Sequence, residues 1–396
     1  MTKSKQPQYR FDGFEGEWEE KELGDIVQIT MGQSPSSQNY TTNPSDYILV
    51  QGNADIKNGY VFPRVWTTQI TKQADKGDII LSVRAPVGDV GKTNYHVIIG
   101  RGVAAIKGNE FIFQILKYLK EIGYWKRIST GSTFDSISSS DIKYAKIQIP
   151  SLPEQEAIGE LFQTVDQLLQ LQDQKLATLK EQKQTFLRKM FPPQGQKVPE
   201  IRLQGFDGEW EENKLGEVSP LRGGYAFESD KFQSDGIKII RISNILSSGI
   251  IGGEFAHYHQ INNDDKYLLT GGSALIAMSG ATTGKVSILN TEEKYYQNQR
   301  VGYFMDLNKI HYNFIIAFLK SLNFNKQIQS VLVAGAQPNI SSKEIDNFQI
   351  LYPRHNVEQE AIGNFFQTLD QQIAQSEEKL TELKALKQTL LNRLFV

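Results

Sequence analysis

The sequence contains no cysteine. Neither a disulfide framework nor a cysteine-based zinc site is therefore possible. Histidine is also scarce, and His257 and His259 stand two residues apart with no evident third ligand, so we expect no metal site. The N-terminus, MTKSKQPQYRF, has no apolar core, and no run approaches the roughly 18 apolar residues that a spanning helix needs. These absences predict a protein of the reducing cytoplasm that does not enter a membrane.

Sequence motifs for catalysis are also missing. An adenine methyltransferase needs an Asn/Asp-Pro-Pro-aromatic string to hold the flipped base, and NPSDY (43–47) lacks the second proline. No GxGxxG string opens a helix, and GDVGKT (88–93) is no phosphate-binding loop because Pro86 stands where that loop requires glycine. We interpret GDVGKT as the glycine turn of a hairpin. The chain is expected to have no catalytic residues and to bind no cofactor.

Neither sign of charge dominates, since 43 Lys and Arg residues oppose 45 Asp and Glu residues and give a net charge of −2. Non-specific DNA affinity comes largely from Lys and Arg at phosphates, so a DNA-binding domain is usually basic. If this chain binds nucleic acid, its basic side chains must gather on one face, or a partner must supply part of the phosphate contacts.

An internal duplication organises the chain. RFDGFEGEWEEKELGDI (10–26) returns as RLQGFDGEWEENKLGEV (202–218), and the tail at 153–191 returns at 357–395. The intervening stretches, roughly 27–130 and 219–334, match only at scattered glycines and basic residues. Such a repeat indicates two copies of one structural unit. We interpret the flanks as performing one task twice and the centres as acting on two different targets. Duplication without functional differentiation is the alternative.

Both repeated tails predict long helices. Their apolar residues recur at alternating steps of four and three, which is typical of a coiled-coil seam. Polar residues interrupt the two seams at matching places, Gln172 with Ser376 and Lys183 with Lys387. At 1.5 Å per residue, each helix of about 38 residues would be about 57 Å long, and we expect the two to pair antiparallel. The alternative is that each helix packs on its own domain. The predicted seam consists of Ile158, Phe162, Val165, Leu169, Leu176, Leu179 and Phe186 in the first helix, and Ile362, Phe366, Leu369, Ile373, Leu380, Leu383 and Leu390 in the second.

Two variable blocks, each opened by a GxxGEWE string and followed by an EQxxI entry into a heptad helix, resemble the specificity subunit of type I restriction–modification systems. The strings that carry the resemblance are GFEGEWEEKELGD (13–25), GFDGEWEENKLGE (205–217), PEQEAI (153–158) and VEQEAI (357–362). Each string alone is weakly specific. Their duplication at matching offsets over nearly the whole chain is highly specific.

The resemblance implies a division of labour. Each variable block would read one half of a split, asymmetric sequence in double-stranded DNA, and the paired helices would set the unread gap. The repeated flanks would dock two methyltransferase subunits that modify adenine N6, and restriction/translocase subunits would join the assembly. S-adenosylmethionine, ATP and Mg would then belong to those partners. Trp18 and Trp210, matched across the repeat, would belong to the domain core or to the methyltransferase dock.

Polar residues of the variable blocks are the candidates for contacting DNA. In the major groove, Arg and Lys read guanine, whereas Asn and Gln read adenine. Some of the candidates are expected to contact phosphates instead of bases. The predicted set is Gln51, Asn53, Lys57, Arg64, Arg84, Lys92 and Arg101 in the first block, and Arg241, Ser243, Asn244, Ser279, Thr282, Thr283, Lys285, Gln299, Arg300 and Gln337 in the second.

The predicted fold class is α+β, with two tandem β-rich target-recognition domains that are each followed by a long helix. Short apolar runs punctuated by glycine predict the strands, and residues 111–128 and 314–332 predict a helix near the end of each block. The expected divisions are a first domain at 1–152, a helix at 153–191, a linker at 192–200, a second domain at 201–354 and a helix at 355–396. The competing hypothesis is a coiled-coil scaffold that joins two globular domains to partner proteins without specific DNA binding.

Overall fold

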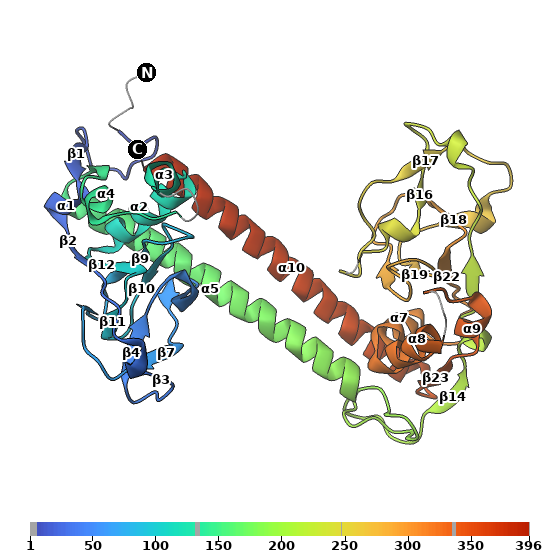
Figure 1. Ribbon diagram of the computed structural model, residues 1–396. Helices are drawn as coiled ribbons and strands as arrows, with labels where there is room; N and C mark the ends of the chain where they lie inside the picture. Colours follow the sequence, from blue (N-terminus) through green and yellow to red (C-terminus); the bar gives the residue numbers. More distant parts are fainter. Residues whose placement is uncertain (1–5, 131–134, 247, 335–337, 396) are drawn as a thin grey trace. The chain divides into compact units, whose positions relative to one another are not determined.

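The computed structural model describes residues 6–130, 135–246, 248–334 and 338–395. The chain forms two compact units, each with one β-rich block and part of each long helix (Figure 1). Unit 1 comprises Met1–Asp173 with Glu378–Val396, and unit 2 comprises Gln174–Glu377.

The described residues of unit 1 form three sheets. Its strands are β1 (Glu19–Glu22), β2 (Gln28–Met31), β3 (Tyr40–Thr41), β4 (Tyr47–Val50), β5 (Ile56–Lys57), β6 (Tyr60–Val61), β7 (Val65–Thr67), β8 (Gln73–Ala74), β9 (Ile79–Ser82), β10 (Val90–Lys92), β11 (Val97–Ile99), β12 (Val103–Lys107) and β13 (Lys146–Ile149). The six-stranded sheet has the order β2-β12-β9-β10-β6-β5, the five-stranded sheet has the order β3-β7-β4-β11-β8, and β1 pairs with β13 alone. In the string GDVGKT, predicted to be a turn, only Gly88 and Asp89 lie in the connection between the antiparallel strands β9 and β10, and Val90–Lys92 form β10 itself.

Unit 2 repeats this plan with smaller sheets. Its strands are β14 (Glu211–Lys214), β15 (Leu221–Gly223), β16 (Ile237–Ile240), β17 (Ala256–Tyr258), β18 (Leu268–Leu269), β19 (Ala274–Ala277), β20 (Val286–Ile288), β21 (Tyr295–Gln297), β22 (Val301–Phe304) and β23 (Gln349–Tyr352). The two four-stranded sheets have the orders β15-β22-β19-β20 and β17-β16-β21-β18, and β14 pairs with β23.

The central strands are apolar without alternation because both of their faces are covered. In β9, Ile79 and Leu81 belong to the core under the helices, whereas Ile80 belongs to the core against the second sheet. In β19, Ile276 belongs to the core under the helices, and Leu275 belongs to the core against the second sheet. Because successive side chains of a strand point to opposite faces, these central strands contribute to two separate cores in each block.

The helices are α1 (Leu23–Ile26), α2 (Glu110–Glu121), α3 (Tyr124–Ile128), α4 (Ser139–Lys143), α5 (Leu152–Lys189), α6 (Leu215–Val218), α7 (Tyr312–Lys320), α8 (Leu322–Ala334), α9 (Ser342–Asp346) and α10 (Asn356–Leu394). The long helices α5 and α10 and the α+β class confirm the predicted fold. The single helices predicted at 111–128 and 314–332 are wrong, because each is two helices. Gly123, with φ +71°, separates α2 from α3, and the extended residue Ser321 separates α7 from α8.

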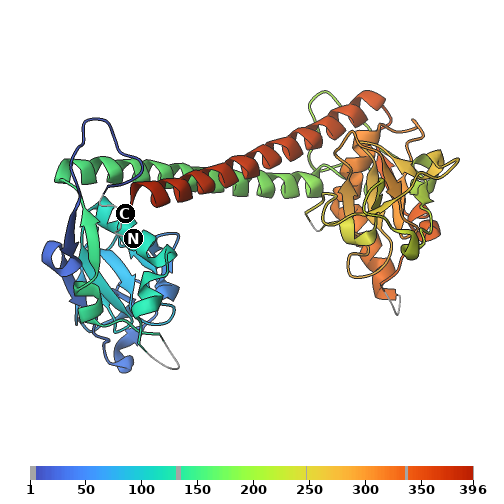
Figure 2. The same ribbon diagram turned by 90° about the horizontal axis from the view of Figure 1, so that it is seen from above.

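The long helices run antiparallel within each unit, where their segments lie side by side (Figures 1 and 2). In unit 1, Phe162 of α5 stacks on Phe395 beyond the end of α10, with ring centroids 5.6 Å apart. In unit 2, Lys180 pairs with Glu377 at 2.6 Å. The predicted seam positions are all buried or half-buried, whereas Leu168, Leu171 and Leu386 outside the seam are exposed.

The seam lysines at 183 and 387 form matching ion-pair clusters. In unit 1, Asp166 accepts from Lys387 at 2.6 Å and from Lys117 of α2 at 3.1 Å. In unit 2, Asp370 pairs with Lys183 and with Lys320 of α7. Burial opposes the ionisation of both aspartates, but the two lysines around each one outweigh it and lower the pKa of each carboxyl group. Each aspartate therefore joins the two long helices to each other and to the block of its own unit, which favours one register.

Removing these charges should make stability less dependent on pH. A carboxyl group whose pKa is lowered by folding stabilises the protein above its unfolded value of about 3.9, and this contribution is lost as the pH falls through the folded pKa. We expect Asp166→Asn or Asp370→Asn to lower the free energy of unfolding by about 1–3 kcal/mol at pH 7, and by much less near pH 3. Denaturant unfolding at both pH values measures the difference. Asp173→Asn, at an exposed position of α5, is the control. An equal loss of stability at both pH values would contradict the assignment.

Candidate nucleic-acid interface

Three loops meet at one edge of the first block. They follow β4 (residues 51–55), follow β9 (84–89) and join β11 to β12 (100–102). The N–H of Gly100 donates to the carbonyl oxygen of Val50 at 2.7 Å, and the N–H of Val83 donates to that of Gly102 at 2.9 Å. A Cβ at Gly102 would lie 1.9 Å from the carbonyl oxygen of Gln51, so this close approach requires glycine. The strand ends thus bring the three loops together.

The second block places its loops in the same way. They follow β16 (residues 241–245), follow β19 (279–285) and join β21 to β22 (298–300). The N–H of Asn298 donates to Ile240 O at 3.1 Å, and the N–H of Met278 donates to Arg300 O at 2.9 Å. The hydroxyl of Thr282 reaches Ile242 O at 3.2 Å. We call the three loops of each block its loop edge.

Most of the predicted DNA-contacting residues lie on these loop edges. Four cations there are exposed and form no ion pair with a carboxylate among the described residues: Arg84, Arg101, Lys285 and Arg300. Ser243 and Gln299 are also exposed, whereas Gln51, Asn53, Arg241, Ser279, Thr282 and Thr283 are half-buried. The guanidinium of Arg64 adjoins the first loop edge, since it donates to Ala54 O at 3.0 Å.

Two predicted residues lie elsewhere. Lys92 of β10 is turned toward α2, where it pairs with Glu110 and stands 5.1 Å from the ring centre of Phe113. Lys57 of β5 is exposed and lies 5.3 Å from the ring centre of Phe62. Neither belongs to the loop edge. Gln337 lies outside the described residues.

The prediction for Asn244 is wrong. Its side chain is fully buried, accepts from the N–H of Arg241 at 3.0 Å, and donates to Gly252 O at 3.0 Å and Glu254 O at 2.9 Å. The matching residue of the first block, Asp55, accepts from the N–H of Gln51 at 2.7 Å. Both side chains shape the loop that follows their strand, and the amide of Asn244 is not available to a base.

A fourth segment adjoins each loop edge and was missed by the sequence analysis. The N–H of Gln33 donates to Ile99 O, and the N–H of Tyr225 donates to Gln297 O, each at 2.8 Å. Gly32 and Gly224 precede them, and a Cβ at either would lie little more than 2 Å from a carbonyl oxygen of the β11 or β21 end. Gln33 is exposed and its amide suits an adenine edge. The two matching glycines could have indicated this segment from the sequence. They lie outside the flanks that align between the two halves of the chain.

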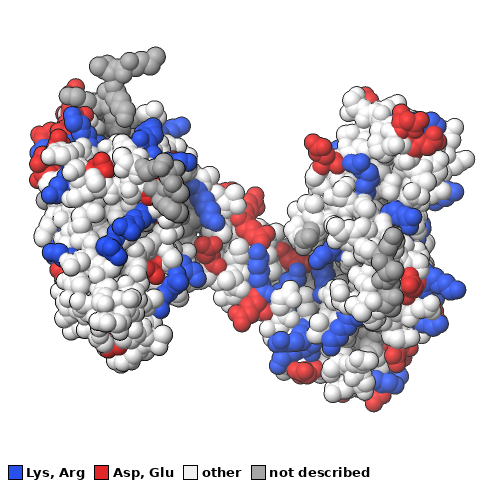
Figure 3. All heavy atoms as spheres, in the orientation of Figure 1, with Lys and Arg blue, Asp and Glu red and all other residues white. Residues whose placement is uncertain are grey.

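Charge alone does not mark the interface. On the face drawn in Figure 3, Lys and Arg are mixed with Asp and Glu in both units, and the surface over β3, β4 and β7 is largely uncharged. We expect phosphate contacts to come from individual cations such as those of the loop edges.

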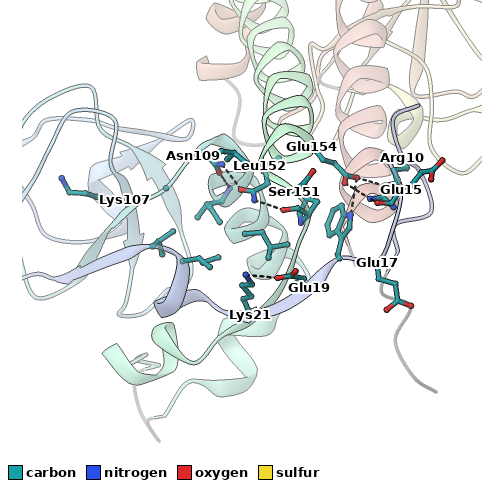
Figure 4. A pocket seen from close by; sticks show the side chains of 18 residues that line it. Arg10, Glu15, Glu17, Glu19, Lys21, Lys107, Asn109, Ser151, Leu152 and Glu154 are labelled. Carbon is teal, nitrogen blue, oxygen red and sulfur yellow. Dashed lines mark hydrogen bonds and ion pairs between the residues drawn. The ribbon is translucent and has the colours of Figure 1, made fainter. Parts of the chain in front are cut away.

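In each unit, an ion pair between a partly exposed arginine and a buried glutamate joins the N-terminal flank to the start of the long helix. Arg10 donates from two nitrogens to the two carboxylate oxygens of Glu154, each at 2.8 Å (Figure 4). Arg202 binds Glu358 with the same geometry and distances. Both glutamates are buried, so the fork ties the N-terminal flank to the first turn of the long helix. The glutamine that follows each glutamate bonds the carbonyl oxygen of a proline just before the helix. Trp18 and Trp210 are 2% exposed and belong to the core.

The described parts of the chain contain no group of three His, Asp or Glu side chains arranged to hold a metal ion. Among the same residues, no helix is both long and apolar enough to cross a membrane.

Comparison with known proteins also finds the duplication. The sequence model of the type I restriction modification DNA specificity domain matches residues 15–181 and again residues 207–385. The chain therefore belongs to this family, and it is a specificity subunit without a catalytic role of its own.

Individual relatives agree with this assignment. The MjaVIII specificity subunit of Methanocaldococcus jannaschii is 23% identical over 394 residues, which cover 96% of this chain and 92% of that protein. The MjaX specificity subunit of the same organism is 35% identical over 180 residues, 43% of this chain and 42% of that protein. The crystal structure of the type I S subunit from M. genitalium has a TM-score of 0.69 at 18% identity, over 99% of both chains. A chain from a type I assembly structure has a TM-score of 0.52 at 18% identity, over 95% of this chain and 97% of that one.

Proposed function

We propose that each block reads one half of a split DNA sequence through its loop edge. The observation that carries this proposal is the equivalence of the two edges. The same strand ends present Gln51, Arg84 and Arg101 in the first block, but Arg241, Ser279 and Gln299 in the second. A shared scaffold with different polar residues at its edge suits two readers with different half-sites. In this proposal, the predicted segments 1–152 and 201–354 are the reading domains.

The same proposal assigns the remaining parts. The helices at 153–191 and 355–396 set the unread gap, and the repeated flanks dock two methyltransferase subunits. Restriction/translocase subunits complete the assembly in the cytoplasm, where the partners bind S-adenosylmethionine, ATP and Mg. Support comes from the family membership and from the type I assembly structure that contains a chain of similar fold. A scaffold that does not contact DNA is the alternative.

Truncation of one loop-edge cation tests the proposal. We expect Arg84→Ala and Arg300→Ala each to weaken binding of the target duplex by about 10- to 100-fold, the 1–3 kcal/mol of one good base contact. A base-reading residue should relax the preference at one position of one half-site, whereas a phosphate contact should lower the salt dependence by about one ion. The target is first selected from random duplexes with the full chain and its methyltransferase subunits.

The matched controls lie at the starts of strands whose C-terminal ends lead into the loop edges. Lys76 precedes β9 and Lys294 precedes β21, and both are exposed. Lys76→Ala and Lys294→Ala should leave sequence preference unchanged. If no sequence is selected, or if the control variants lose as much affinity as the loop-edge variants, the scaffold hypothesis is favoured.

A further inference from the structure

Unit 1 contains a hollow of about 690 Å³ that lies outside the loop edge (Figure 4). It opens between β1, the start of α5 and the junction of β12 with α2. Its apolar lining includes Ile26, Val27 and Ile112, and Figure 4 shows carboxylates of the GEWE flank beside it. Glu15, Glu17 and Glu19 line it together with Lys21 and Lys107.

The corresponding place in unit 2 is filled by the chain itself. In unit 1 only Gly108 separates the end of β12 from Asn109, the N-cap of α2. In unit 2 the longer connection 305–310 separates the end of β22 from His311, the N-cap of α7. Ile310 is 2% exposed and belongs to the same buried cluster as Val218. The connection is anchored where Lys309 Nζ donates to Glu217 O at 2.8 Å and the Met305 N–H donates to Pro220 O at 3.0 Å.

Matched residues of the two flanks differ in burial because the 305–310 connection covers the flank of unit 2. The strings LGDIV (23–27) and LGEVS (215–219) occupy equivalent places in the two flanks. Val218 is 3% exposed and Ser219 is fully buried, whereas Ile26 and Val27 remain half-buried. The apolar surface that the 305–310 connection covers in unit 2 is therefore open in unit 1.

We propose that the hollow of unit 1 binds one segment of a partner protein that carries a lysine followed by an aliphatic residue. Lys309 and Ile310 are the internal example of that chemistry. The aliphatic side chain would cover Ile26 and Val27, and the ammonium group would bond the carbonyl oxygen of Asp25, which matches Glu217. Acidic side chains outnumber basic ones in the lining, with Glu15, Glu17, Glu19 and Glu154 against Arg10, Lys21 and Lys107, and this balance favours a cationic segment over a DNA phosphate.

Because unit 2 fills its own equivalent of the hollow, one chain offers one open site. In an assembly with two copies of a partner subunit, only one copy finds this contact. The site goes beyond the proposed reading of DNA and does not depend on it.

Peptide binding to the full chain tests the inference. The probe is a fluorescent peptide with the sequence of residues 306–312, DLNKIHY, and the control peptide carries Glu and Asp in place of its Lys and Ile. We expect saturable binding of the first peptide at one site per chain and at least tenfold weaker binding of the second. A benzophenone group on the peptide should crosslink to residues of unit 1 that line the hollow.

Two protein variants complete the test. In the first, the sequence of 305–310 replaces Lys107 and Gly108 and so fills the hollow, and peptide binding should be lost. In the second, Glu15→Lys with Glu19→Lys reverses charge at exposed positions and should weaken binding at least tenfold even if the first variant fails to fold. No binding at about 1 mM peptide, two equivalent sites, crosslinks confined to unit 2, or unchanged binding to the charge-reversed variant would overturn the inference. Binding of the target duplex is measured in parallel, so failure to bind DNA and failure to bind the peptide are separate results.

Discussion

Exchanging residues 27–130 for the block of a relative with another target is expected to change one half of the recognised DNA sequence and to leave the other half unaltered. All three loops of the first loop edge lie inside this segment. The Arg10–Glu154 fork and the β1–β13 pair lie outside it, so the unit keeps its flank structure. Specific sites are bound roughly 10³- to 10⁷-fold more tightly than non-specific DNA. The exchange should therefore remove almost all preference for the original half-site.

The exchange must preserve the contacts that cross its boundary. Lys117 binds Asp166 of α5, and Phe111 packs on Phe395 with ring centroids 5.4 Å apart. A donor block should therefore supply Lys and Phe at these two positions. Methylation mapping of the assembled enzyme identifies the new target, and exchange of 219–334 is the reciprocal control. A change in both half-sites, or in neither, would show that the blocks do not read independently.

The sequence was most informative where one periodicity decides the structure. The unbroken 4,3 spacing predicted α5 and α10 because a single apolar stripe has one way to be buried in a helical pair. The apolar runs between glycines predicted β9 and β12 for a similar reason, since a strand covered on both faces is apolar over most of its length, and only the last residues, Ser82 and Lys107, are polar.

Other features depend on contacts between segments that no local pattern connects. Lys183 and Lys387 were visible as interruptions of the seam, but their partners Asp370 and Asp166 also bind Lys320 and Lys117 of the divergent blocks. The sequence does not distinguish an exposed asparagine after a strand from a buried one. The role of Asn244 could be recognised only from its contacts with Gly252 and Glu254. The proposal that the exposed loop-edge residues contact DNA remains a prediction from residue type and placement.

Lengthening both long helices by one heptad is expected to widen the unread gap while leaving both half-site sequences unchanged. The insertions belong after Leu179 in α5 and after Leu383 in α10. The first point lies between Asp166 and Lys183, and the second lies between Asp370 and Lys387. Both ion-pair clusters therefore keep their partners, and the seam keeps its period of seven.

The size and failure modes of this change follow from helix geometry. A heptad adds about 10 Å at 1.5 Å per residue, which corresponds to about three base pairs at 3.4 Å each. Inserting two residues at the same points instead turns each seam by about 200° and should abolish assembly or DNA binding, because Asp166 and Lys387 then face different sides. Methylation mapping of the heptad variant measures the gap, with unfolding by denaturant as the check on the helical pair. If the variant binds and methylates DNA with the original gap, the helices do not set the spacing, and another contact within the assembly must position the two half-sites.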